Sequence, residues 1–303
     1  MLNIEVTTHL SPQRKPSHHT MLIRLGYDIE FNLPQSVALV ALLNVHPSRE
    51  ADLREPDQLH IEPQVRADQY VDRFGNRCTR FLAPQGRLRL WNSTLIQDSG
   101  NQDQVNFMAR QHPVQELPFD HLTYLMNSRY CEVDRLSNIA TELFGNTAPG
   151  WGRVQAIVNW VHSRVQFGYQ FARATRTALD VYTVRVGVCR DFQHLAIAFC
   201  RCMHIPARYA TGYLGDIGVP ISAAPMDFSA WFEVYLEGNW WTFDARHNTP
   251  RVGRVLMATG RDAADVAMTT SFGMAELAKF IVVTSEVPSV LPFQNFQSNA
   301  VGQ

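Results

Sequence analysis

A cysteine at the start of an apolar segment is the residue of this sequence best placed to do chemistry. Cys189 follows Val186-Gly187-Val188 and opens a stretch that is apolar on nearly every face through Met203, which predicts a helix buried in the core. The free N–H groups and the dipole at a helix start favour a thiolate and can hold the oxyanion of an acyl-transfer intermediate. We therefore expect a nucleophile with a lowered pKa; the alternative is a small apolar core residue.

A second candidate closes a predicted hairpin. Two alternating apolar runs between Met226 and Asp244 flank Gly238-Asn239, a strong turn pair. Residues before the first strand and after the second then meet at one end of a sheet. Asp244 is either an acidic partner at that end or a turn residue.

These segments resemble the bacterial transglutaminase-like family, a branch of the papain-type cysteine fold. The motifs follow the family's order and spacing: Gly187-Val-Cys-Arg-Asp-Phe-Gln-His-Leu, Ile205-Pro-Ala-Arg-Tyr-Ala-Thr-Gly-Tyr-Leu, Ala230-Trp-Phe-Glu-Val-Tyr-Leu, Trp241-Thr-Phe-Asp244 and Gly260-Arg-Asp-Ala-Ala-Asp-Val. The β-rich N-terminal half is similar, less closely, to the companion region of that family. The resemblance implies a Cys–His–Asp triad with Cys189 as the nucleophile and Asp244 as the acid.

The chain departs from the family at the histidine of this triad. That histidine immediately precedes the Ala-Trp pair, where this sequence has Ser229. A serine hydroxyl cannot accept the thiol proton or protonate a leaving amine at useful pH. His247, three residues beyond Asp244, lies at the same end of the hairpin as Asp244. From there it can fold back towards Cys189 as a substitute base. His194 lies about 140° around the helix from Cys189, so we expect a core histidine there.

Two residues before the cysteine loop are candidates for stabilising an oxyanion. Members of the family place a side chain near the oxyanion in this segment, and here Tyr169 and Gln170 occupy it. Either side chain can donate a hydrogen bond. Aromatic packing is the alternative role for Tyr169.

Three functions remain open. The first is an amide or isopeptide hydrolase, or an acyl transferase, that acts on a peptide-type substrate through a thioester on Cys189. The second is a catalytically silent homologue whose cleft binds a peptide or protein partner. The third is a variant site in which Ser229 hydrogen-bonds a water or the substrate. The sequence names no substrate and no oligomeric state.

The surrounding elements predict an α+β protein. Strand-like runs about ten residues apart, separated by turns such as Gly75-Asn76, predict an antiparallel β-sandwich-like N-terminal domain over residues 21–115. Helical periodicity follows, so we expect a papain-like transglutaminase core over residues 120–303, packed on the sandwich. Residues 1–20 read as a flexible arm.

Composition restricts the partners and the compartment. The net charge of -1 creates no field for nucleic acid or an anionic membrane, and no apolar run of about 18 residues predicts a membrane span. The polar first twenty residues and five irregularly spaced cysteines favour a cytoplasmic protein with reduced thiols. Cys200-x-Cys202-x-His204 lacks helical metal-ligand geometry and a fourth ligand. We therefore expect neither metal nor cofactor.

Overall fold

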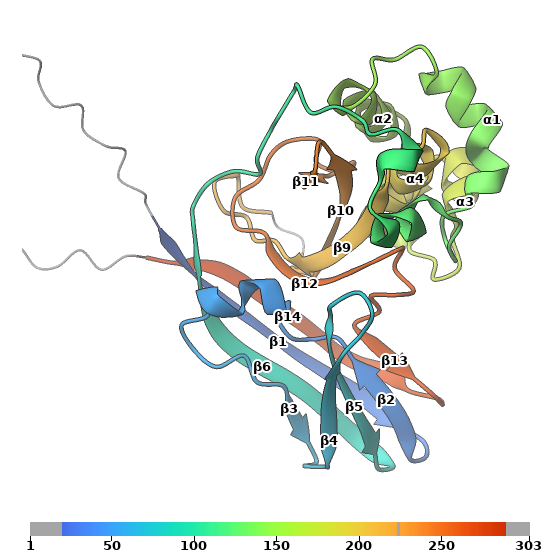
Figure 1. Ribbon diagram of the computed structural model, residues 1–303. Helices are drawn as coiled ribbons and strands as arrows, with labels where there is room; N and C mark the ends of the chain where they lie inside the picture. The colour runs from blue at the N-terminus through green and yellow to red at the C-terminus, as the bar shows by residue number, and fades with distance from the viewer. Residues whose placement is uncertain (1–19, 223–224, 289–303) are drawn as a thin grey trace, which may run out of the picture.

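The computed structural model describes residues 20–222 and 225–288. It confirms the α+β class, because antiparallel sheets form one part of the molecule and a helical part with its own sheet forms the other (Figure 1). The predicted arm over residues 1–20 lies outside the described residues except for Thr20. Within the described ranges, no helix has the length and apolar character needed to cross a bilayer.

Two four-stranded antiparallel sheets form the sandwich. Their orders are β14-β1-β6-β3 and β13-β2-β5-β4. The strands are β1 (Met21–Leu33), β2 (Val37–Ala41), β3 (His60–Glu62), β4 (Ala67–Val71), β5 (Arg77–Ala83), β6 (Gly86–Asp98), β13 (Thr269–Ser271) and β14 (Glu276–Val287). Successive side chains on a strand point to opposite faces, and the inward set of β1 is buried: Ile23, Leu25, Tyr27, Ile29 and Phe31.

The last two strands correct the predicted domain boundary. We expected the core to continue to residue 303, but β13 pairs with β2, and β14 pairs along β1. Figure 1 shows the red β14 beside the blue β1. Most side chains of β14 are exposed or half-buried, so its sequence lacks the clean alternation that reveals a half-buried strand. Residues 269–287 therefore belong to the sandwich.

The intervening chain builds the core around one buried helix. The helices are α1 (Val133–Phe144), α2 (Trp151–Arg164), α3 (Ala178–Val184) and α4 (Cys189–Cys202), with short 3-10 turns η1 (Pro47–Asp52), η2 (Val114–Glu116), η3 (Phe119–Leu125) and η4 (Tyr169–Phe171). The core sheet has the order β11-β10-β9-β12. Its strands are β9 (Ala207–Tyr213), β10 (Ser229–Leu236), β11 (Asn239–Phe243) and β12 (Val255–Gly260); β7 (Gln166–Phe167) and β8 (Val186–Gly187) form a separate parallel pair. Helix α4 packs against the other three helices and against β9 and β10.

One side-chain amide joins the sandwich to the core. Asn76, in the turn between β4 and β5, is 0% exposed. Its Nδ2 donates to the Thr259 carbonyl, and its Oδ1 accepts from the Thr259 N–H, both at 2.8 Å. The amide thus pairs with β12 as a strand backbone would.

Replacing this amide tests the joint. Asn76→Ala leaves the buried N–H and C=O of Thr259 without partners, so we expect a loss of at least about 2 kcal/mol in the free energy of unfolding. Urea denaturation followed by tryptophan fluorescence measures it. The exposed Asn101→Ala is the matched control and should change that energy by less than about 0.5 kcal/mol. Equal effects of the two substitutions on the free energy of unfolding would contradict the role of Asn76 in joining the sandwich to the core.

Candidate active site

The nucleophile candidate stands where the sequence places it. Cys189 is the first residue of α4, preceded by the N-cap Val188. A Cβ on Gly187 would lie 2.7 Å from Cβ of Asp191, so this position requires glycine because the Asp191 side chain closely approaches its backbone.

A buried carboxylate fixes the start of the helix. Asp191 is fully buried and accepts the Val188 N–H at 3.0 Å. Arg176 and Arg190 form ion pairs with the same carboxylate. Arg176 also donates to the carbonyl of Phe171 at 2.5 Å, which ties the loop before α3 to the cysteine helix.

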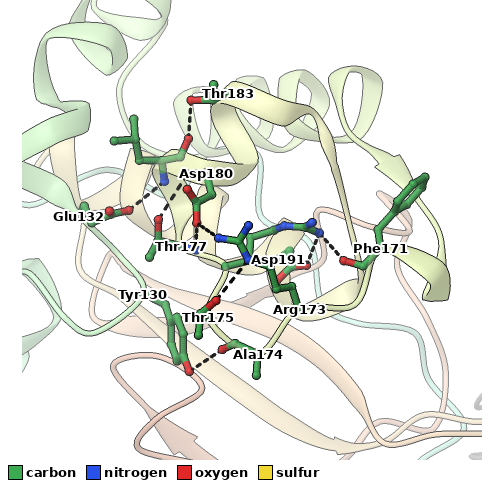
Figure 2. Close-up of polar contacts among 12 residues, drawn as sticks. Tyr130, Glu132, Phe171, Arg173, Ala174, Thr175, Thr177, Asp180, Thr183 and Asp191 are labelled. Carbon is green, nitrogen blue, oxygen red and sulfur yellow. Dashed lines mark hydrogen bonds and ion pairs between the residues drawn. The ribbon is translucent and has the colours of Figure 1, made fainter.

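The loop before α3 has supports of its own. Figure 2 shows the Tyr130 hydroxyl donating to the Ala174 carbonyl, at 2.9 Å, and the polar side chains gathered at the start of α3. There Thr177 and Asp180 form a capping box, each accepting an N–H of the other residue. The surroundings of Cys189 are therefore held on two sides.

A cavity of about 160 Å³ lies beside Cys189. Its wall combines titratable and polar side chains from one end of the core sheet, where β9 and β11 end and β10 begins, with Tyr169 and the start of α4. It is lined by Tyr169, Cys189, Leu214, Asp216, Ile221, Ser222, Pro225, Met226, Asp227, Phe228, Ser229, Arg246, His247 and Arg251.

Asp244 follows β11 and is only 5% exposed. Its Oδ2 lies 2.8 Å from Nδ1 of His247 and accepts from Arg254 at 3.0 Å. Its Oδ1 accepts from Gln193 at 3.1 Å and from the N–H groups of Arg246 and His247. Burial alone would raise the pKa of this carboxyl, but the hydrogen bond from His247 and the charge of Arg254 hold it well below its usual range.

The contact with Asp244 determines which nitrogen of the His247 ring faces the carboxylate. An ionised carboxylate can only accept hydrogen bonds, so Nδ1 carries a proton, and Nε2 is the nitrogen that can act as an acceptor when it carries none. The structure therefore brings His247 and Asp244 together and places His247 on the wall of the cavity that also holds Cys189. Ser229, the first residue of β10, lines the same cavity.

The thiol pKa differs from the expectation. Burial raises the pKa of Cys189 to about 11; Arg246 and the N–H of Arg190 act in the opposite direction, while Asp227 adds to the rise. The predicted lowering is wrong because the enclosure of the sulfur, which sequence does not reveal, outweighs the helix start. A thiol with a raised pKa stays protonated at neutral pH, so chemistry at this sulfur requires a base.

The two oxyanion candidates separate in the structure. Tyr169 lines the cavity, and its ring meets Phe167 edge-on with ring centres 5.3 Å apart. Gln170 is exposed, and its side chain lies over Gly168, away from the cavity-lining set. Of the pair, only Tyr169 is therefore placed to meet a ligand there.

His194 is a core residue, as its helical offset indicates. It is fully buried, its ring stacks on Tyr130 at 4.9 Å, and its Nε2 accepts the Ala263 N–H. Within the described residues, all five cysteines are free thiols, and no group of three or more His, Cys, Asp or Glu side chains is arranged to hold a metal ion.

Sequence reasoning missed two charged residues behind the site. Arg254 is 9% exposed and reaches from Asp244 to both carboxylate oxygens of Asp103, at 2.9 and 3.1 Å. Asp103 belongs to the connector that leaves the sandwich. Its N–H donates to the Arg251 carbonyl, and its carboxylate accepts the Arg251 N–H. No local pattern links residues so distant in sequence.

The acid dependence of stability tests the Asp244 network. The folded pKa of Asp244 lies below its unfolded value of about 3.9, so its contribution is present above pH 4 and is lost as pH falls towards the folded pKa. Asp244→Asn should cost about 3–5 kcal/mol in free energy of unfolding at pH 7 and clearly less at pH 3. Urea titrations at both pH values measure this, with the exposed Asp120→Asn as control. An equal loss at both pH values would refute the ionised state.

Comparison with known proteins identifies relatives of this chain in sequence and in fold. The Transglutaminase-like superfamily profile matches residues 137–245. The chain is 24% identical over 212 residues to an uncharacterized protein of Mycobacterium leprae (strain TN), covering 68% of this chain and 75% of that protein. The crystal structure of a "putative cysteine protease" from Cytophaga hutchinsonii superposes with a TM-score of 0.77 and 29% identity, over 90% of this chain and 93% of the other. The chain therefore carries a domain of the transglutaminase-like superfamily.

Proposed function

We propose that this protein cleaves or transfers amide or isopeptide bonds of a peptide-type substrate with Cys189 as the nucleophile, His247 as the base and Asp244 as the residue that orients the base. One observation carries the proposal: Nδ1 of His247 lies 2.8 Å from Oδ2 of Asp244, while His247 and Cys189 line one cavity.

His247 would fill the role left by the serine. The resemblance puts the family's histidine at Ser229, whose hydroxyl cannot act as a base at neutral pH. The carboxylate that would orient that histidine instead holds His247. The imidazole arrives from the turn after β11 rather than from the start of β10.

The proposed reaction has two steps. His247 Nε2 takes the thiol proton as Sγ of Cys189 attacks the carbonyl carbon, forming the C–S bond; the C–N bond then breaks, and His247 returns the proton to the departing amine. Water or a second amine next attacks the thioester, loses a proton to His247 and releases Sγ. The backbone N–H groups at the start of α4 would hold the developing oxyanion, and Tyr169 is the oxyanion candidate whose side chain lines the cavity.

A catalytically silent protein that binds a peptide or protein partner is the second candidate. It is favoured by the thiol pKa of about 11, on which no imidazole acts as a main cause. In such a protein the cavity and the Asp244 network would serve recognition, and Cys189 would stay protonated.

Alkylation of Cys189 separates the two candidates. If His247 shares the thiol proton, iodoacetamide should label Cys189 below pH 7, and His247→Asn should slow labelling at pH 6 at least about tenfold. Peptide mapping by mass spectrometry locates the label. His204→Asn, at an exposed residue with φ of 60° that Asn tolerates, is the matched control. Labelling that begins only well above pH 8, unchanged by His247→Asn, would exclude the enzyme proposal.

Restoring an imidazole at the family position gives a second test. In an active enzyme, Ser229→His introduces a competitor for Asp244 and should lower labelling of Cys189 at pH 6. In a silent protein the same change supplies the missing base and should raise it. Ser229→Asn adds bulk without a base and controls for crowding. A rise with Ser229→His alone would favour the silent protein.

A further inference from the structure

Arg246 places a fixed positive charge in the cavity beside the nucleophile. Its N–H donates to Oδ1 of Asp244 at 2.9 Å, and its carbonyl lies 2.8 Å from Nδ1 of His162. Its guanidinium sits over the ring of Phe167, 3.8 Å from the ring centre. Backbone and side chain are both held, so the charge is preorganised.

No acid of the described chain neutralises this charge directly. Within residues 20–222 and 225–288, Arg246 makes no ion pair, and its one side-chain contact of note is the Phe167 ring. Asp216 and Asp227 both line the cavity, and Asp227 interacts electrostatically with Arg246 without forming an ion pair with it. The second cavity arginine, Arg251, differs because its Nη2 donates to the Gly215 carbonyl.

The charge of Arg246 dominates at the sulfur. Among the charged groups acting on Cys189, Arg246 has the largest effect and exceeds the opposing effect of Asp227. A ligand whose carbonyl carbon reaches Sγ would therefore lie close to the guanidinium of Arg246, whose charge is opposed at the sulfur by Asp227 and Asp244. A guanidinium matches the planar geometry of a carboxylate.

We propose that Arg246 selects acyl donors that carry a free carboxylate next to the reacting carbonyl. Two kinds of donor share this chemistry: a peptide with an acidic side chain at the reacting residue, and an isopeptide whose side-chain carbonyl reacts while its α-carboxylate stays free. This proposal rests on Cys189 being the nucleophile, and it assigns Arg246 to specificity.

Charge-selective alkylation tests the proposal without turnover. The probes are iodoacetate, an anion, and iodoacetamide, its neutral analogue. The ratio of their rates at Cys189, divided by the same ratio for N-acetylcysteine, cancels any change in thiol pKa. We expect a normalised ratio above one, reduced at least about threefold by Arg246→Gln and retained by Arg246→Lys.

Two controls define the outcome. Arg164→Gln removes an exposed cation elsewhere and should leave the normalised ratio unchanged, whereas Asp227→Asn removes the opposing charge and should raise it. A wild-type ratio at or below one, or a ratio insensitive to Arg246→Gln, overturns the proposal.

Four anilide substrates then distinguish the two sources of carboxylate. They are an α-glutamyl peptide anilide, its glutaminyl counterpart, a γ-glutamyl anilide with a free α-carboxylate, and the same compound as its α-amide. Preference in kcat/KM for one acidic member, lost in Arg246→Gln, identifies the source. Equal turnover of acidic and neutral members overturns the inference while upholding the enzyme. Charge-selective alkylation without turnover of any substrate supports the anion site and counts against the enzyme.

Discussion

The buried carboxylate of Asp244 is the constraint on which the site depends. An ionised group in this position is stable only if its oxygens are fully hydrogen-bonded. The donors come from α4, from the turn after β11 and from Arg254, just before β12. Gln193, which links the carboxylate to α4, also bonds the backbone of Ala230 and Ala245. Satisfying this one charge therefore aligns the cysteine helix, the hairpin and the following strand.

The turn after β11 concentrates the polar chemistry in very few residues. Asp244 accepts the N–H groups two and three positions along, the local geometry in which an aspartate shapes its own turn. As a result, Asp244, Arg246 and His247 are held together in one hydrogen-bonded turn. Small displacements of β11 would shift Arg246 and His247 together relative to Cys189.

Short stretches of sequence predicted the helices, strands and turns that depend on interactions between residues near in sequence. The apolar stretch after Cys189 and the Gly238-Asn239 hairpin identified α4 and the end of the sheet that carries Asp244. The three-residue spacing from Asp244 made His247 a candidate base. The Asp103–Arg254 pair could not be foreseen, because it joins charges from distant segments. The pKa of Cys189 was wrongly expected to fall, because enclosure by surrounding segments is a tertiary property. The predicted C-terminal boundary of the core was wrong because β14 is an exposed edge strand, in which apolar and polar residues alternate only weakly.

The pairing of β1 with β14 also bears on how the protein is made. Leu22 pairs with Val287, so during synthesis β1 leaves the ribosome long before its partner strand exists. Until then one edge of β1 presents unpaired backbone groups, the kind of edge that recruits foreign strands. The helical core, whose sequence lies between the two, can be completed first. A nascent chain that ends before β14 would therefore hold a finished cysteine helix beside a sheet with an open edge.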